Sequence, residues 1–132
     1  MFQKKIGILI ASLVLLVAVL VGCVKTTTVV KSAGASITTT MSFSKDILPI
    51  FEKSCATSGC HGAGGKTPVL TTASAYNSLL IGKYFKASDP ENSLLILWMN
   101  GKKSPVMPLG AAPDANNTAK IYAWINQGAK NN

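Results

Sequence analysis

The stretch Cys55-Ala56-Thr57-Ser58-Gly59-Cys60-His61 decides how this chain is interpreted. Two thiols are followed directly by an imidazole, and His61 is the only histidine in the sequence. C-x-x-C-H is typical of a segment that attaches a c-type haem. Here four residues, not two, separate the cysteines, and Ser58-Gly59 supplies small residues for the longer loop. The pattern predicts one covalent haem, with Cys55 and Cys60 bonded to the porphyrin and His61 bound to the iron.

Residues 1–22 have the pattern of an export signal. Residues 1–5 form a short basic segment, and an unbroken run of apolar or small residues follows up to Val21. Leu20-Val21-Gly22-Cys23 resembles a bacterial lipobox, in which the cysteine becomes the lipid-modified first residue of the mature protein. The alternative is an uncleaved anchor, because residues 6–24 carry no charge and are long enough to cross a bilayer. Both interpretations tether the folded part outside the cytoplasm.

The cell envelope is therefore the expected location, either periplasmic or associated with the outer membrane. Val24, a neutral residue, follows the lipobox cysteine. By analogy with Gram-negative lipoproteins, this favours the outer membrane.

The other two cysteines leave haem-free alternatives open. An oxidising compartment permits a disulfide between Cys55 and Cys60, but a disulfide does not explain the adjacent His61. Zinc bound by the same three residues is the other alternative, and the sequence offers no convincing fourth ligand for it.

The charge of the chain comes from lysine alone. Lysines number 13 against five acids, and there is no arginine. Because nucleic-acid recognition relies on arginine for base edges and phosphates, this composition argues against a nucleic-acid partner. The lysines form either an ordinary solvated surface or a docking face for an acidic redox partner. Lys102-Lys103 is their densest point.

Residues 23–40 are predicted to be a lipidated cysteine with a Thr/Ser-rich linker, and residues 41–132 a single small domain. The first expected helix presents Ile47, Ile50 and Phe51 on one face and has Asp46 as its N-cap. The second runs from Asp89 to Met99.

A third helix begins after Asn116 or Asn117 and ends by Gly128, with Ile121, Trp124 and Ile125 as its apolar face. A shorter helix is expected around residues 73–80. No alternating strand pattern of useful length occurs. The predicted fold class is all-α, with three to four helices.

An electron-transfer haem needs a second axial ligand, and without a second histidine methionine is the natural choice. Of the candidates in residues 41–132, Met99 lies at helical spacing after Leu95, which is typical of a core residue. Met107 lies in Pro105-Val106-Met107-Pro108, which cannot be helical. Met107 is therefore the predicted distal ligand, and Met99 is the second choice.

Five segments together resemble the small monohaem cytochrome c domains called planctomycete-type, which occur on bacterial lipoproteins. They are Asp46-Ile47-Leu48-Pro49-Ile50-Phe51, the stretch from Cys55 to His61, Asp89-Pro90-Glu91-Asn92-Ser93-Leu94-Leu95, Met107-Pro108, and Ala123-Trp124-Ile125-Asn126-Gln127-Gly128-Ala129. The resemblance implies a cytochrome c-like helical fold in which the first and last helices pack across each other. It also implies Cys55 and Cys60 as thioether attachments, His61 as proximal ligand and Met107 as distal ligand. The aromatic residues Trp98, Tyr122 and Trp124 are expected in the core, against the porphyrin or as donors to a propionate.

The function that these patterns predict is one-electron transfer by a membrane-tethered protein that is not an enzyme. A haem-based sensor with a displaceable distal methionine is the alternative from another class. No metalloprotease helix, nucleophile elbow or phosphate-binding loop is found in the sequence.

Overall fold

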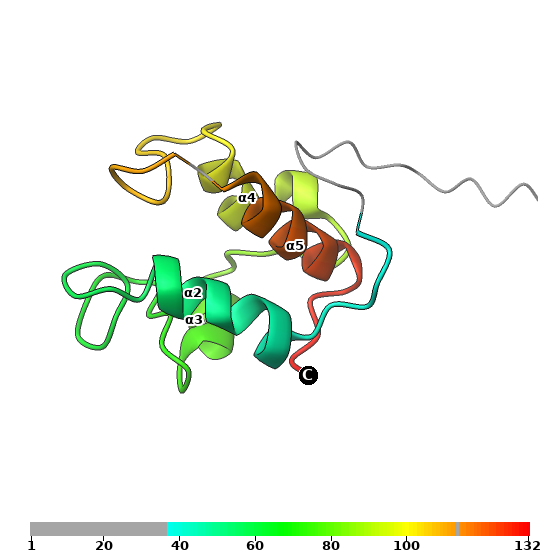
Figure 1. Cartoon of the computed structure of the whole chain (residues 1–132), viewed down its shortest axis with the longest axis horizontal. Coiled ribbons are helices and arrows are strands. Elements are labelled where there is room, and N and C mark those ends of the chain that lie inside the picture. The colour runs from blue at the N-terminus through cyan, green and yellow to red at the C-terminus, as the bar shows by residue number, and fades with distance from the viewer. Residues whose placement is uncertain (1–36, 113) are drawn as a thin grey trace, which may run out of the picture.

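A computed structural model describes residues 37–112 and 114–132 (Figure 1). The predicted export signal, Cys23 and the predicted linker as far as residue 36 lie outside the described residues. Within them the chain is helical and has no strand, which confirms the predicted all-α class. The elements are the π-helix η1 (Phe43–Ile47), α2 (Leu48–Ser54), α3 (Ala75–Ile81), the 3₁₀-helix η2 (Pro90–Asn92), α4 (Leu94–Met99) and α5 (Ala115–Asn126). In the same residues, no helix has the length and apolarity needed to cross a membrane.

The first helical segment begins at Phe43, so the prediction of Asp46 as its N-cap was wrong. Ser42 is the cap, and its hydroxyl accepts a hydrogen bond from a backbone N–H of the first turn. The Asp46 carboxylate instead reaches back and accepts from the Ser42 N–H at 2.8 Å. The wide first turn closes when the Leu48 N–H donates to the Phe43 carbonyl. Pro49, which has no N–H to donate, follows directly in α2.

The predicted helix from Asp89 to Met99 is broken into η2 and α4 at Ser93. Ser93 is extended (φ −81°, ψ 126°) and fully buried. Its hydroxyl accepts from the Lys86 N–H and donates to the Asp89 carbonyl, each at 2.9 Å. These side-chain bonds compete with helical ones and fix the loop before η2 against the start of α4.

The last two predicted helices form close to the expected positions. The N-cap of α5 is Asp114, whose carboxylate accepts from the Asn117 N–H at 2.9 Å, so the helix starts slightly earlier than predicted. Its predicted apolar face is buried. The helix ends before Gly128, whose φ of +100° suits glycine. The shorter helix expected around residues 73–80 is α3, Ala75–Ile81.

Aromatic packing joins the two ends of the domain. The ring of Trp124 in α5 lies 5.2 Å from Phe43 in η1 and 5.1 Å from Phe85. Tyr76 of α3 meets the Phe43 ring edge-on at 5.2 Å. The first helical segment therefore packs against the last helix.

The C-terminal residue also binds this first segment. The Asn132 side chain accepts from the Phe43 N–H and its main-chain carbonyl from the Ser44 N–H, both at 2.9 Å. The otherwise unpaired N–H groups at the start of η1 are thereby satisfied.

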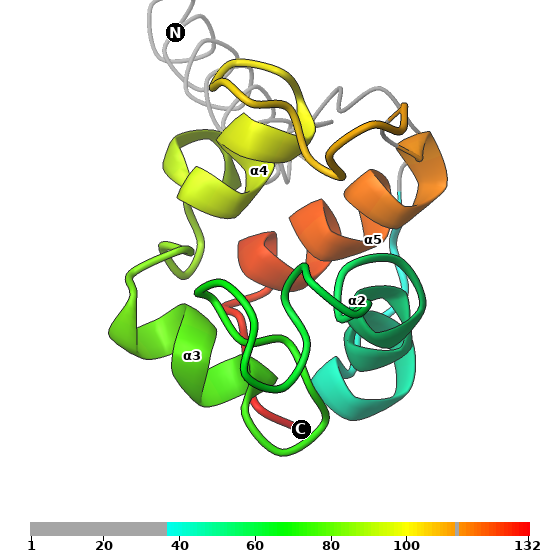
Figure 2. The same ribbon diagram turned by 90° about the vertical axis from the view of Figure 1, so that its left-hand side faces the viewer.

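Two long connections lie at one end of the helices. One joins α2 to α3, and the other joins α4 to α5; both extend to the left in Figure 1. In the view of Figure 2, α4 and α5 lie above α2 and α3; the connection from α4 to α5 runs along the top, and the connection from α2 to α3 lies below, between these two helices. The candidate ligands Cys60, His61 and Met107 all lie in these connections.

Candidate haem-binding site

Cys55, Cys60 and His61 lie on one loop after α2 that is closed by backbone hydrogen bonds. Cys55 follows the last residue of α2. The Cys60 N–H donates to the Thr57 carbonyl at 3.0 Å, and the His61 N–H donates to the Cys55 carbonyl at 3.1 Å. The Lys66 N–H closes the next turn on the Cys60 carbonyl at 2.7 Å. The four-residue gap between the cysteines thus forms a bonded turn rather than a free loop.

Glycine is required where this turn folds back on itself. A Cβ at Gly65 would lie 2.3 Å from the Cys60 carbonyl oxygen, and one at Gly62 would lie 2.9 Å from the Ala56 oxygen. Gly59 has a φ of +76° and open space around it. Glycine is favoured there by the backbone conformation and not by a lack of room for a side chain.

The two cysteines are free thiols in different surroundings. Cys60 is exposed and Cys55 is half-buried. Burial raises the pKa of the Cys55 thiol to about 11, and the neighbouring Cys60 adds to that rise. The Cys55 thiol is therefore protonated at neutral pH.

The imidazole of His61 is oriented by two carbonyl groups. Its Nδ1 lies 3.0 Å from the Pro68 oxygen and 3.1 Å from the Lys66 oxygen. Both oxygens only accept hydrogen bonds, so Nδ1 must carry the proton. In the neutral imidazole this tautomer leaves the lone pair on Nε2, which is the atom that could then bind a metal.

A cavity of about 630 Å³ opens beside Cys55, between α2, the end of α4 and the start of α5. This volume lies in the range of small-molecule and cofactor sites. Ile50, Met99 and Pro108 give it apolar walls, whereas Lys45, Lys53 and Lys120 bring charge to it. Sequence reasoning did not identify these three lysines, because they come from different helices and form no motif.

The two candidate methionines occupy different positions. Met99 is 9% exposed, packs in the core and lines the cavity, as expected of a core residue. Met107 is half-buried in a non-helical segment, as predicted. Its N–H donates to the Trp98 carbonyl at 3.3 Å, and the next residue, Pro108, lines the cavity. Met107 is thus attached to the end of α4, next to a residue that lines the cavity. Of the four predicted haem-binding residues, Cys55 lines the cavity, whereas Cys60, His61 and Met107 do not.

Two of the three aromatic residues singled out from the sequence already have hydrogen-bond partners. The Trp124 indole N–H donates to the Lys130 carbonyl, and the Tyr122 hydroxyl donates to Glu91, each at 2.9 Å. Burial first, and then the Glu91 bond, raises the pKa of Tyr122 to about 12. The Trp98 indole nitrogen is buried without a partner, the only such side-chain N or O atom found in the described residues.

The types of donor present fit a covalently attached haem: two free thiols on one loop, one of them lining the cavity, an imidazole oriented through Nδ1, and a thioether beside the cavity-lining Pro108. They fit zinc less well. Across residues 37–112 and 114–132, no three His, Cys, Asp or Glu side chains are grouped closely enough to hold a metal ion among themselves.

The lysine pair predicted as a docking point remains largely in solvent. Lys102 and Lys103 are both exposed, and the Lys102 ammonium lies 3.6 Å from the Glu91 carboxylate. An ion pair this exposed contributes little to stability, so it leaves the lysine available to other anions.

Comparison with protein-family models, curated proteins and solved structures finds no significant match to this chain.

Proposed function

We propose that this protein is a one-electron carrier with a single covalent c-type haem. Cys55 and Cys60 attach the haem, His61 is the proximal ligand and Met107 is the distal ligand. The haem, when bound, supplies an iron that alternates between ferric and ferrous states. The chain supplies the attachment, the axial ligands and a partly apolar cavity.

The orientation of His61 is the observation that carries the proposal. Its Nδ1–H is fixed by the Pro68 and Lys66 carbonyls, and this leaves Nε2 as the coordinating atom. His61 directly follows one free thiol, and a second free thiol lies on the same turn. A histidine that only faces solvent would not need its ring oriented by two carbonyl groups.

Attachment requires both cysteines in the reduced form. Each S–H adds across one vinyl group of the porphyrin: a C–S bond forms, and the hydrogen goes to the other vinyl carbon. No oxidant is consumed. Cys60 is exposed, and the half-buried Cys55 lines the cavity, so both thiols are open to the porphyrin.

Met107 suits the distal position because its segment is fixed at both ends. Its N–H is bonded to α4, and Pro108 on its other side restricts the backbone. A weak neutral ligand held in this way loses little conformational entropy when it binds iron.

The location and the partners belong to the same proposal. Lipid on Cys23 tethers the carrier to a membrane outside the cytoplasm, and residues 24–40 hold the domain away from the bilayer. Its electron-exchange partners are proteins with acidic docking surfaces, attracted by an all-lysine positive charge.

The test is expression of the full chain in a host proficient in cytochrome maturation, followed by a pyridine haemochrome spectrum. A spectrum of thioether-bonded haem, lost in His61→Ala, is expected. Haem that is extracted by acidic organic solvent, or a colourless product, would refute the proposal.

A second candidate is a haem-based sensor, favoured by the half-burial of Met107 in a non-helical segment. A thioether that is partly open to solvent can be replaced by a gas molecule. Carbon monoxide distinguishes the two functions: a carrier stays largely unbound at neutral pH, whereas a sensor binds rapidly and completely in the reduced state.

A further inference from the structure

The last residues of the predicted linker are fastened to the end of α5. Gln127, the C-cap of α5, accepts a hydrogen bond from the Met41 N–H at 2.7 Å, and its side-chain N–H donates to the Thr39 carbonyl at 2.9 Å. Met41 is buried in the core, and Ile37 packs against the core. The chain therefore enters the domain beside the C-terminal end of α5.

The candidate haem site lies at the other end of the same helix. Asp114, the N-cap of α5, lines the cavity, and so does Lys120. Gln127 is 13 positions after Asp114, and at 1.5 Å per residue these positions span about 20 Å. In Figure 1 the first described residues lie beside the right-hand end of α5, whereas the two long connections extend to the left. The tether and the site thus lie at opposite ends of the domain.

The length of free chain limits how the domain can lie on a membrane. In the proposed function Cys23 carries the lipid, so the 13 residues from 24 to 36 connect the bilayer to the fastened segment. At 3.3–3.6 Å per residue, this tether spans about 45 Å at most. To turn the site towards the bilayer, the tether must pass back along α5, which takes up about 20 Å of that reach. Confining the chain in this way costs conformational entropy that the opposite orientation does not lose.

We propose that Gln127 fixes the membrane tether at the end of the domain opposite the candidate haem site, so that the site faces water. The inference rests on the proposed function, because the lipid on Cys23 supplies the anchor. It also specifies the class of partner. A protein that approaches from the aqueous side exchanges electrons with this site, and a carrier dissolved in the bilayer does not. Lys53 and Lys120, which line the cavity, are then open to the acidic surface of that protein.

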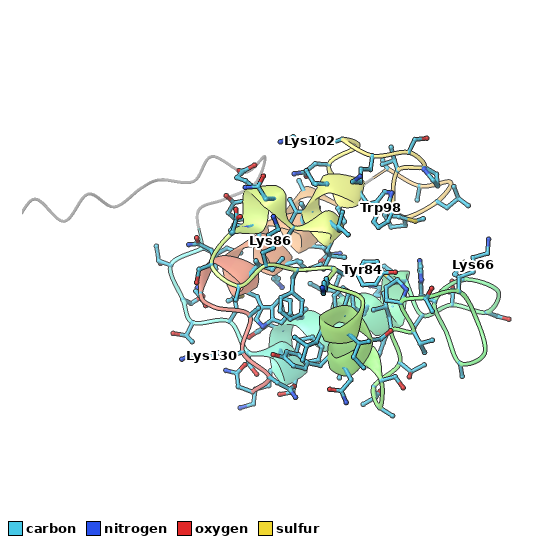
Figure 3. All side chains as sticks on the ribbon, turned by 180° about the vertical axis from the view of Figure 1, so that it is seen from behind. Lys66, Tyr84, Lys86, Trp98, Lys102 and Lys130 are labelled. Atoms are coloured by element: carbon cyan, nitrogen blue, oxygen red, sulfur yellow. The ribbon has the colours of Figure 1, made fainter. Side chains whose placement is uncertain are left out.

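The main test labels lysines from the membrane side. The full lipidated chain is placed in phosphatidylcholine vesicles that contain a lipid with an amine-reactive ester on its head group, and modified lysines are identified by mass spectrometry. Exposed Lys130 lies near the fastened end, whereas exposed Lys66 lies towards the opposite end (Figure 3). Each rate is divided by that of the same lysine with a water-soluble ester in detergent. Lys130 is expected to be labelled several-fold faster than Lys66 and the cavity-lining Lys120.

Gln127→Ala tests the fastening itself. The variant loses both bonds to the linker, so the Met41 N–H is expected to exchange with deuterium several-fold faster. Release of residues 37–40 also lengthens the tether, and the labelling preference for Lys130 is expected to fall. Because Gln127 is only half-buried, its replacement leaves the core in place. Asn126→Ala is the matched control: it removes an exposed amide one residue earlier, and both measurements are expected to match the wild type.

Equal or faster labelling of Lys66 or Lys120 relative to Lys130 would overturn the inference. So would exchange of the Met41 N–H that is unchanged in Gln127→Ala. Neither measurement requires haem, and the haemochrome spectrum tests the proposed function separately. A colourless protein with the expected order of labelling would overturn the proposed function and confirm the orientation. Protein that does not associate with vesicles would overturn both, because it would carry no anchor.

Discussion

Replacement of Gly65 by alanine tests the bonded turn that holds both thiols and His61. The new Cβ would lie 2.3 Å from the Cys60 carbonyl oxygen, whereas real Cβ contacts are essentially never under 3.0 Å. The two atoms must separate by about 0.7 Å. The obstacle is backbone, which cannot rotate away, and the displaced carbonyl is the one that accepts the Lys66 N–H. Overpacking of this kind costs about 2 kcal/mol.

The effect on the site is expected to exceed the effect on the fold. The Lys66 carbonyl is one of the two groups that orient His61, so displacement of this turn rotates the imidazole. We expect Gly65→Ala to incorporate less haem per protein than the wild type and to unfold about 2 kcal/mol more easily in urea.

Gly64→Ala is the matched control one residue away. Gly64 has a φ of +71° and nothing within 4 Å of the new Cβ. This substitution costs about 1 kcal/mol of backbone strain and leaves His61 in place, so the haem content is expected to stay near that of the wild type. Equal haem content and equal stability in Gly65→Ala and wild type would refute the bonded turn.

Three further predictions concern the distal ligand, an alkaline transition and a buried serine. Met107→Ala is expected to lower the reduction potential and admit carbon monoxide, whereas Met99→Ala loses about 2–5 kcal/mol of stability in urea and keeps the potential. The raised pKa of Tyr122, about 12, gives stability that is fully present below pH 10 and is lost as pH rises towards 12. Tyr122→Phe should remove that part of the alkaline loss in pH-dependent unfolding. Ser93→Ala removes the part-buried hydrogen bond from the Lys86 N–H, and a loss of about 1 kcal/mol in urea unfolding is expected.

Different results would contradict each of these. A potential changed by Met99→Ala and not by Met107→Ala would make Met99 the ligand. An alkaline profile identical in Tyr122→Phe and wild type would remove the role of the Glu91 bond. A neutral Ser93→Ala would mean that water or a shifted backbone satisfies the Lys86 N–H.

The helices were predictable because their apolar faces follow local periodicity. Ile121, Trp124 and Ile125 recur at helical spacing, and these residues are buried in α5. The predicted helix boundaries are wrong where a side-chain hydrogen bond to a residue outside the helix, or back to an earlier residue, sets the boundary. The break at Ser93 depends on Lys86, in the preceding loop, and nothing in the helical pattern signals that contact.

The predicted start of the first helix was wrong for a related reason. Asp46 is a good capping residue by type, but Ser42 four positions earlier takes that role, with Asp46 as its reciprocal partner. The sequence contains both candidates and does not rank them. The wide π-turn that separates them has no simple signature.

At the candidate site, the sequence supplied the residues and the structure supplied their surroundings. Spacing alone indicated Cys55, Cys60 and His61, but the protonated nitrogen of His61 depends on carbonyls five and seven residues later. The unpaired Trp98 N–H was likewise beyond prediction, because satisfaction of a buried donor is a property of three-dimensional packing.

Mass spectrometry of one tryptic peptide tests the central claim most directly. Cleavage after Lys53 and Lys66 releases residues 54–66, which contain Cys55, Cys60 and His61. The account predicts that this peptide, from protein made in a host that attaches haem, carries one haem and no thiol that iodoacetamide can alkylate. A peptide with two alkylated cysteines, or with an internal disulfide and no haem, would contradict it.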